Sequence, residues 1–243
     1  MDLRLRGDDS ILLVFLEGQM FMKNFQIAAS LLAANFACLG DDVNKVIVAG
    51  ANALHLDAMD NHFVRNLTIG PLICEALRNY GIQAEINVHL MTKPVDSLII
   101  DFAKAKANSI IFHPEASSHV SKSIALIHEQ GCKAGIALKP ETSLSYLDKI
   151  MNDIDTIMVM SVNPGFGGQA FIPSSLEKIK QIRDIIDKSN RDIELMVDGG
   201  IKVSNIASVA VAGANHFVVG TGIFHESSYS AALSAMRNEL EKS

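Results

Sequence analysis

The sequence predicts an α/β fold in which eight parallel strands, each followed by a helical segment, close into a (β/α)8 barrel. From Gln26 onward, short apolar runs with the period of a strand alternate with longer stretches whose apolar residues repeat with the period of a helix. The alternation occurs eight times, and no Pro/Ser/Gly-rich linker or block of charge interrupts it. Strands that alternate with helices form parallel sheets, and eight such units close a TIM barrel.

Eight runs are predicted to be strands because each is short, apolar and bounded by polar or turn-forming residues. In chain order they are Gln26–Leu32, Ala53–Met59, Ala84–Met91, Ser109–His113, Lys133–Leu138, Thr156–Val162, Ile193–Asp198 and His216–Gly220. An open doubly wound sheet is the alternative for the same series. The even count of eight, and the absence of a GxGxxG segment after the first strand, favour the barrel.

The segments between these strands carry the apolar stripe of an amphipathic helix. The first stripe consists of Leu39, Val43, Val46 and Ile47, and the sixth of Leu176, Ile179, Ile182 and Ile186, with Pro173 in the first turn of that helix. Four glycines each follow a helical run and precede a strand, where a left-handed cap is expected: Gly50, Gly81, Gly131 and Gly213.

The barrel is predicted to be a single catalytic domain over residues 26–243 of the 243-residue chain. This division allots about 27 residues to each strand–helix unit, close to the length of a compact βα module. Residues 1–25 stand outside the repeating pattern and are expected to form a peripheral N-terminal extension that need not be ordered.

Composition and charge exclude several classes of protein. With 21 Lys and Arg against 27 Asp and Glu, the net charge is −6, and the basic residues form no cluster, so neither nucleic acid nor an anionic membrane surface is an expected partner. The early apolar run Ile11–Leu16 is far shorter than the roughly 20 residues of a membrane span. The 3 cysteines lie far apart without a CxxC pair, which suits a reducing compartment and predicts a cytoplasmic location.

Polar side chains gather at the carboxyl ends of the predicted strands, where the chemistry of a parallel barrel takes place. His55, Asp57 and Met59 are two residues apart and therefore share one face of the second strand. His89 and Met91 do the same in the third. The first strand carries Ser30 near its end, the fourth ends at His113, the sixth passes through Met160, and the seventh ends at Asp198.

Two histidines and two aspartates from three strands predict a divalent-metal site with two nitrogen and two oxygen ligands: His55, Asp57, His89 and Asp198. The alternative is that each is an ordinary buried polar group with its own hydrogen-bond partner. Zinc, iron(II), manganese and cobalt all fit such ligands, and the sequence does not choose among them.

Three glycine clusters follow the last three strands, where barrels often bind phosphate through backbone N–H groups. Their members are Gly165, Phe166, Gly167 and Gly168, then Gly199 and Gly200, and then Gly220, Thr221 and Gly222. Such loops would let an acidic chain hold a phosphate with few cations. Phe166 and its neighbours are expected to form a loop that closes over the phosphate, the alternative being a static turn.

Seven segments, spread over nearly the whole predicted barrel, resemble the signature segments of the ribulose-phosphate 3-epimerase family. They are Ala29–Leu31, His55–Asp60, Asn66–Pro71, Val88–Met91, Phe112–Ala116, Met160–Gln169 and Val197–Gly200. The resemblance implies an enzyme that interconverts D-ribulose 5-phosphate and D-xylulose 5-phosphate in the pentose phosphate pathway of carbohydrate metabolism.

Carried over position by position, the resemblance implies one divalent metal per subunit, held by His55, Asp57, His89 and Asp198. It also implies Asp57 and Asp198 as the acid–base pair and Ser30 and His89 as substrate contacts. The glycine clusters would surround the phosphate, with Thr221 standing where the family commonly has Ser. A homo-oligomer is expected from the same resemblance.

This chemistry needs such groups for a physical reason. Inverting a carbon beside a ketone requires a proton to leave from one face and return to the other, and two carboxylates on opposite sides achieve that. A Lewis acid on the ketone oxygen stabilises the enediolate that an aspartate alone is too weak a base to form. Met59, Met91 and Met160 are expected as an apolar lid, and His113 as a partner that orients a ligand, although each can equally be a core residue.

Three other functions compete with this interpretation. A 3-epimerase of a six-carbon ketose phosphate would share every motif and differ only in pocket size. A sugar-phosphate-binding barrel without catalysis would not need paired aspartates. A metal-dependent hydrolase usually has more histidine ligands around an activated water.

Overall fold

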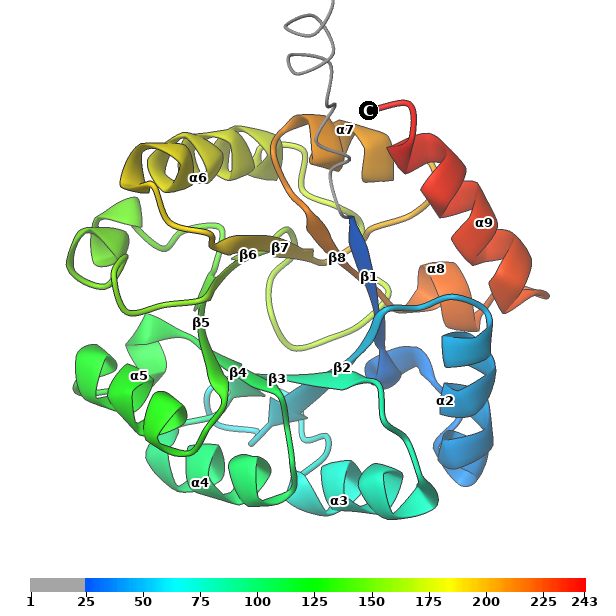
Figure 1. Cartoon of the computed structure of the whole chain (residues 1–243), viewed down its shortest axis with the longest axis horizontal. Coiled ribbons are helices and arrows are strands. Elements are labelled where there is room, and N and C mark those ends of the chain that lie inside the picture. Colours follow the sequence, from blue (N-terminus) through cyan, green and yellow to red (C-terminus); the bar gives the residue numbers. More distant parts are fainter. Residues whose placement is uncertain (1–24) are drawn as a thin grey trace, which may run out of the picture.

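The structure, a computed structural model, describes residues 25–243. Eight parallel strands form a closed ring in which β1 is hydrogen-bonded to β8, and helices surround the ring (Figure 1). The strands are β1 Gln26–Ser30, β2 Ala53–Met59, β3 Glu85–Met91, β4 Ser109–Phe112, β5 Lys133–Leu138, β6 Thr156–Met160, β7 Glu194–Asp198 and β8 His216–Val219. The pairing of β1 with β8 confirms the predicted barrel and excludes the open sheet.

The outer layer consists of α-helices and shorter 3-10 helices. The α-helices are α2 Leu39–Val48, α3 Pro71–Tyr80, α4 Asp96–Lys104, α5 Val120–Glu129, α6 Ser175–Ser189, α7 Ile206–Val211, α8 Thr221–Phe224 and α9 Tyr229–Leu240. The 3-10 helices are η1 Leu31–Ala33, η2 Phe36–Cys38, η3 Pro114–Ala116 and η4 Leu144–Lys149.

All eight predicted strands are present, but several end earlier than predicted. β1 ends at Ser30 because the chain turns into η1 at Leu31, and β6 ends at Met160. The fifth strand–helix unit also differs from the prediction, because the segment after β5 contains no α-helix and only the six-residue 3-10 helix η4. Pro173 precedes α6, which begins at Ser175, and does not lie in its first turn.

Two apolar layers form the core. The layer between barrel and helices contains the predicted stripes of α2 and α6, of which the fully buried members are Val43, Val46, Ile179, Ile182 and Ile186. The layer inside the barrel consists of Ala28, Ala53, Ile111, Ala137, Met158, Met160, Val162, Met196 and Val218. Side chains therefore fill the barrel interior, and three of these apolar residues, Met160, Val162 and Val218, line the pocket at its carboxyl end.

The predicted helix caps are confirmed by the backbone. Gly81 has φ 105° and its amide donates to the carbonyl of Arg78, a conformation that side chains with a Cβ rarely adopt. The other three cap glycines, at positions 50, 131 and 213, also have positive φ.

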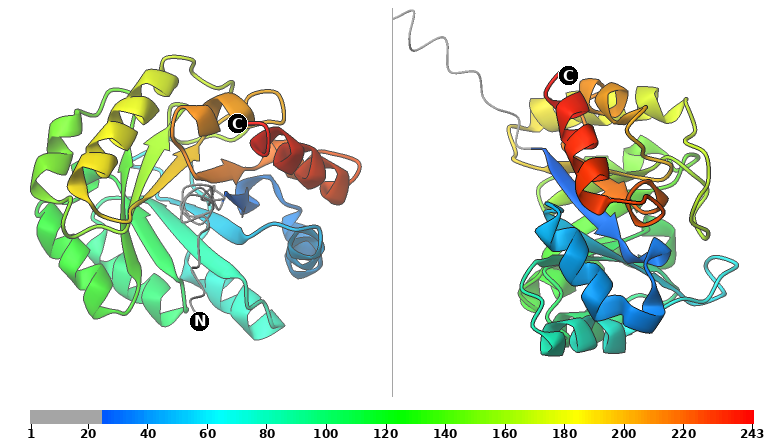
Figure 2. Two further views of the ribbon diagram at one scale, coloured as in Figure 1. Left: turned by 45° about the horizontal axis from the view of Figure 1, so that its top comes forward. Right: turned by 90° about the vertical axis from the view of Figure 1, so that its right-hand side faces the viewer.

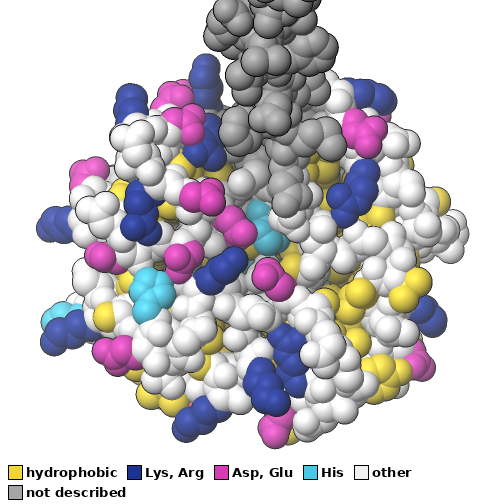
Figure 3. Space-filling model, in the orientation of Figure 1, with side chains coloured by type: hydrophobic (Ala, Val, Ile, Leu, Met, Phe, Trp, Pro, Cys, Tyr) yellow, Lys and Arg dark blue, Asp and Glu magenta, His cyan; other side chains and the backbone are white. Residues whose placement is uncertain are grey.

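Loops after the carboxyl ends of the strands gather at one end of the barrel. The β2–α3 loop, cyan, and the β6–α6 loop, yellow-green, both project from that end (Figure 2, right). On the face drawn in Figure 3, acidic and basic side chains are interspersed. Among the described residues, the helices are all too short or too polar to cross a membrane. The predicted extension, residues 1–25, lies outside the described residues except for Phe25.

Candidate active site

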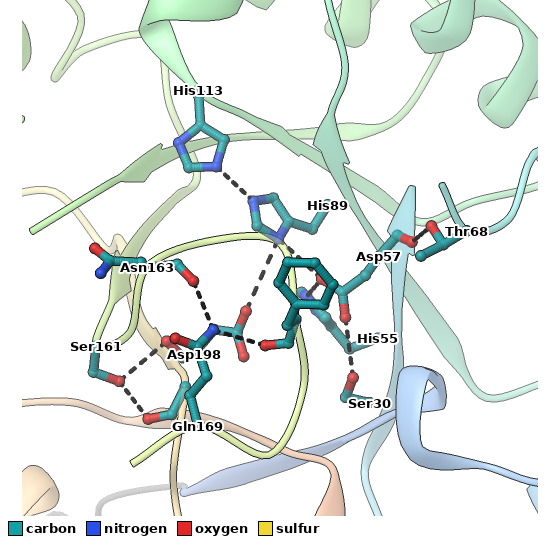
Figure 4. A network of polar contacts seen from close by, with 12 residues as sticks. Ser30, His55, Asp57, Thr68, His89, His113, Ser161, Asn163, Gln169 and Asp198 are labelled. Carbon is teal, nitrogen blue, oxygen red and sulfur yellow. Dashed lines mark hydrogen bonds and ion pairs between the residues drawn. The ribbon is translucent and has the colours of Figure 1, made fainter. Parts of the chain in front are cut away.

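Four side chains converge at the carboxyl end of the barrel: His55 and Asp57 from β2, His89 from β3 and Asp198 from β7. Each offers one ligand atom, and these atoms all lie within 4.8 Å of one another. Oδ1 of Asp57 lies 3.5 Å from Nε2 of His55 and 3.1 Å from Nδ1 of His89, which is 3.9 Å from Oδ2 of Asp198. The side chains point toward a common centre (Figure 4). The cluster predicted from sequence therefore has the donor set to hold a metal ion.

The register of the barrel explains why these residues meet. Asp57 and His89 are direct partners in the β2–β3 pairing, so their side chains are neighbours on the inner face. Alternation along β2 places His55 one step lower on the same face. Asp198 is the last residue of β7, and β8 and β1 separate it from β2 in the ring. Ser30, the last residue of β1, donates from Oγ to Oδ2 of Asp57 at 3.0 Å.

His55 supports the interpretation of the cluster as a metal site. Its side chain is 0% exposed, and within residues 25–243 neither ring nitrogen has a hydrogen-bond partner. An unpartnered polar atom in a protein interior costs roughly 1–3 kcal/mol, and ligation of a cation by Nε2 would satisfy one of the two nitrogens. Two imidazoles and two carboxylates are ligands that suit zinc, iron, manganese and cobalt.

The two carboxylates lie in the same cavity but differ in acidity. Burial by itself would raise the pKa of Asp57, but the imidazoles of His55 and His89, at 3.5 and 3.1 Å, outweigh it electrostatically and hold the pKa well below its ordinary value. Burial raises the pKa of Asp198 to about 7, and the negative charge of Asp57 adds to that rise. Two acidic groups whose environments push their pKa values apart are typical of an acid and a base acting as a pair.

His113, the residue after β4, lies behind His89 and is fully buried. Its Nε2 lies 2.9 Å from Nε2 of His89. Burial, together with the charges of His89 and Lys139, lowers the pKa of His113 well below its ordinary value, so its ring is neutral and its Nε2 can accept a hydrogen bond from Nε2–H of His89. A proton on Nε2 of His89 leaves its Nδ1 free to bind a cation.

A pocket of about 70 Å³ opens above this cluster. It brings together most of the residues predicted for substrate and lid: Ser30, Asp57, Met59, Met91, Met160, Gly165, Phe166, Gly167, Gly168, Asp198, Gly199, Gly200, Gly220 and Thr221. His55, His89 and His113 do not line it, because they lie fully buried beneath its wall. Leu32, Ala33, Pro164, Gln169 and Ile201 also line the pocket and were not predicted.

The turn after β7 requires glycine at two successive positions. Gly199 has φ 123°, and a Cβ there would lie 2.6 Å from Cγ2 of Val162. Gly200 has φ 67°, and a Cβ there would lie 2.4 Å from the amide nitrogen of Phe171. The backbone of this turn can therefore approach a ligand closely. In the β6–α6 loop, the amides of Gly167 and Gly168 donate no hydrogen bond to another described residue.

Several residues that shape the site were missed by the sequence reasoning. Ser161 is fully buried, and its Oγ donates to the carbonyls of Asp198 and Gly199 at 3.1 and 2.6 Å. The Gln169 amide donates to the carbonyls of Asn163 and Phe166 at 2.7 and 2.8 Å and so folds the β6–α6 loop on itself (Figure 4). Ser161 and Gln169 lie within Met160–Gln169, one of the segments that resemble the family, and this position is the signal in the sequence that could have identified them.

Comparison with known proteins agrees with this geometry. A model of the ribulose-phosphate 3-epimerase family matches residues 26–224. The chain belongs to the ribulose-phosphate 3-epimerase family. A ribulose-phosphate 3-epimerase of Serratia marcescens is 60% identical over 208 residues, covering 86% of this chain and 99% of that protein. One of Escherichia coli (strain K12) is 55% identical over 221 residues, covering 91% and 98%. The resemblance predicted from seven segments is thereby confirmed, and the chain is an enzyme of the isomerase type.

Solved structures show the same fold at much lower identity. The KGPDC of Streptococcus mutans has a TM-score of 0.64 with 14% identity, covering 89% of this chain and 97% of that one. The thiamine phosphate pyrophosphorylase of Pyrococcus furiosus has a TM-score of 0.61 with 15% identity, covering 90% and 97%. At such low identities, these two structures show that the chain shares their barrel fold and show nothing about its function.

Proposed function

We propose that this enzyme interconverts D-ribulose 5-phosphate and D-xylulose 5-phosphate by two-base proton transfer at C3. One observation carries the proposal: Asp57 and Asp198 reach the same small pocket from strands that are not neighbours. A substrate carbon held between them would meet one carboxylate on each face. The proton taken by one aspartate leaves an enediolate, which the other aspartate reprotonates from the opposite side.

The acidities of the pair support this division of work. In one direction the ionised Asp57 takes the C3 proton while Asp198, whose pKa burial and Asp57 raise to about 7, supplies one. In the other direction the two exchange roles. Ser30, whose hydroxyl donates to Asp57, would hold that carboxylate in place and contact the substrate.

We infer that His55, Asp57, His89 and Asp198 hold one divalent ion. When bound, such an ion would act as a Lewis acid that stabilises negative charge on the ketone oxygen. The residues themselves would contribute orientation, because the hydrogen bond between His113 and His89 holds the His89 ring in place.

The phosphate would lie against the backbone of the three glycine clusters. All their residues except Gly222 line the pocket, and the amides of Gly167 and Gly168 donate no hydrogen bond within residues 25–243. A pocket of about 70 Å³ is smaller than the ~150 Å³ cavity that admits a benzene molecule. The β6–α6 loop with Phe166, 59% exposed, would therefore open to admit the sugar and close over it. Met59, Met91 and Met160 would then cover the reacting carbon.

The test is nuclear magnetic resonance of D-ribulose 5-phosphate in heavy water, with and without a chelator. Deuterium is expected at C3 together with the signals of the epimer, and Asp57→Asn and Asp198→Asn are each expected to lower conversion about 10²–10⁴-fold. Asp187→Asn, an exposed carboxylate on α6, is the matched control and should convert at the rate of the natural enzyme. Conversion by Asp198→Asn at that same rate would refute the two-base assignment.

Parallel assays on a six-carbon ketose phosphate separate the two epimerase hypotheses, which differ only in the size of the substrate. A barrel that binds sugar phosphate without catalysis would show binding but no exchange at C3. The cytoplasmic location and the homo-oligomer stay predictions, the second of which analytical ultracentrifugation would test.

A further inference from the structure

The β2–α3 loop, residues 60–70, folds back on the strand that carries the catalytic carboxylate. Asp60 and Leu67 form an isolated antiparallel bridge. The amide of Asn61 donates to the carbonyl of Asn66 at 2.8 Å, and the amide of Thr68 to the carbonyl of Met59 at 3.3 Å. The loop is therefore a small hairpin, and its returning arm, residues 66–68, runs beside the end of β2.

Thr68 anchors this arm to the backbone of β2 on both sides of Ala58, near the end of the strand. Its hydroxyl donates to the main-chain carbonyl of Asp57 and accepts from the amide of Met59 at 3.0 Å (Figure 4). One side chain thus restrains the peptide units that set where the Asp57 carboxylate points. A hydroxyl that both donates and accepts cannot be replaced by a methyl group without leaving two backbone groups unpaired.

Asn66 anchors the same arm to the phosphate loop, on the other side of the pocket. Its Nδ2 donates to the carbonyl of Gly165 at 2.7 Å, across 99 positions of sequence. Val64, 8% exposed, packs at the same place, since a Cβ on Gly165 would lie 3.4 Å from its Cβ. Gly165 begins the glycine cluster that lines the pocket.

We propose that Asn66 and Thr68 are positioning residues that link the phosphate loop to the catalytic carboxylate Asp57. The inference rests on the proposed function, because it takes Asp57 as a base and residues 165–168 as part of the phosphate site. The two anchors are two residues apart on one arm of a hairpin, so a displacement of the loop at Gly165 is transmitted to β2 through a short, hydrogen-bonded segment. Closure of the loop on the phosphate thereby sets the carboxylate that removes the proton, which uses binding energy remote from the reacting carbon.

The test compares kcat, KM for D-ribulose 5-phosphate and the inhibition constant of inorganic phosphate. Asn66→Ala is expected to raise KM and the phosphate inhibition constant together by about fivefold, the value of one hydrogen bond. Thr68→Val is expected to lower kcat about tenfold with the phosphate inhibition constant within twofold of the natural enzyme, and Thr68→Ser, which keeps the hydroxyl, to restore kcat. Leu67→Ala, a 73% exposed side chain between the two, is the matched control and should change none of the three constants.

The double variant Asn66→Ala/Thr68→Val tests the link itself. If the arm acts as one element, the loss in kcat/KM is smaller than the product of the two single losses by at least threefold. If the loss in kcat/KM of the double variant equals the product of the two single losses, the two residues act independently and the proposed link is refuted. If Asn66→Ala has the same kcat, KM and phosphate inhibition constant as Leu67→Ala, the role of Asn66 as an anchor is refuted. Should Asn66→Ala alter the yield of folded protein, Asn66→Asp, which is closer in size and replaces the donor by a carboxylate, gives the same readout. Absence of epimerisation by the natural enzyme would refute the proposed function. If the natural enzyme is active but Asn66→Ala changes none of its kinetic constants, only this inference is refuted.

Discussion

Removal of metal from the four-ligand cluster is expected to lower the thermal stability of the protein by a large and measurable amount. Without an ion, the fully buried His55 has no hydrogen-bond partner on either ring nitrogen among the described residues, and the charge of Asp57 disfavours ionisation of Asp198. Each unpaired buried polar atom costs about 1–3 kcal/mol. A bound divalent ion relieves both penalties, so its binding free energy adds directly to the stability of the folded state.

The size of the effect follows from mass action. An ion supplied at about 1,000 times its dissociation constant stabilises the folded state by about 4 kcal/mol. For a domain of this length, each kcal/mol shifts the melting temperature by about 2–4 °C, so the expected rise is about 8–16 °C. The rise should depend on ion concentration, because it reflects occupancy of the site.

Scanning calorimetry of chelator-treated protein, with zinc, manganese, cobalt or iron(II) added back, measures the shift. His55→Leu replaces a ligand by an apolar side chain of similar size, so this variant should gain little from any ion and melt no lower than the natural metal-free protein. His225→Leu, a substitution of an exposed histidine, controls for ions bound at the surface. A shift below 2 °C with all four ions, or a full shift in His55→Leu, would contradict the assignment of this cluster as a metal site.

Three further predictions concern stability. Gly200→Ala, with a Cβ 2.4 Å from the amide nitrogen of Phe171 and φ 67°, is expected to cost about 2–4 kcal/mol in urea unfolding. Gly70→Ala, where the Cβ meets open space, should cost far less, and equal costs would refute the steric argument. Tyr229→Phe removes a 2.8 Å hydrogen bond to the buried carboxylate of Asp42 and should lower the free energy of unfolding by about 1.5–3 kcal/mol. An unchanged midpoint of urea unfolding would contradict this prediction. Three backbone N–H groups donate to the Asp60 carboxylate, outweigh the effect of burial and lower its pKa. The ionised carboxylate therefore stabilises the folded state at pH values above its ordinary pKa, and this stabilisation is lost as the pH falls through its pKa in the folded protein. The stability difference between the natural protein and Asp60→Asn should therefore shrink between pH 6 and pH 3, and a constant difference would argue against this stabilisation.

Much of the site could be predicted because it depends on the local geometry of strands. Two-residue alternation places His55, Asp57 and Met59 on one face whatever surrounds them, and the carboxyl ends of parallel strands meet at one end of a barrel. The glycine clusters were identifiable because few other residues allow the backbone conformation that the structure shows at Gly199 and Gly200. These signals are short-range, so they survive without knowledge of the tertiary structure.

The residues that were missed act through contacts between distant segments. Asn66 reaches Gly165 across 99 positions, and Ser161 reaches Gly199 across 38. A serine, threonine or asparagine in a loop has the same local signature whether it bonds to solvent or to a loop on the far side of a pocket. The ends of the strands were misjudged for a related reason: Leu31 is as apolar as a strand residue, and it begins η1 because the chain must turn away from the ring there.

The amino-acid sequence alone determined the fold class, the number of strands and which residues form the His/Asp cluster, because period, count and residue type are properties of the linear chain. Only the tertiary structure decided that the barrel closes β8 onto β1, that the two carboxylates have different acidities, and that the β6–α6 loop is tied to β2 through residues 66–68. Ring closure, burial and hydrogen bonding across the pocket depend on distances between segments that are far apart in sequence. Those distances exist only once the chain has packed its helices around the ring.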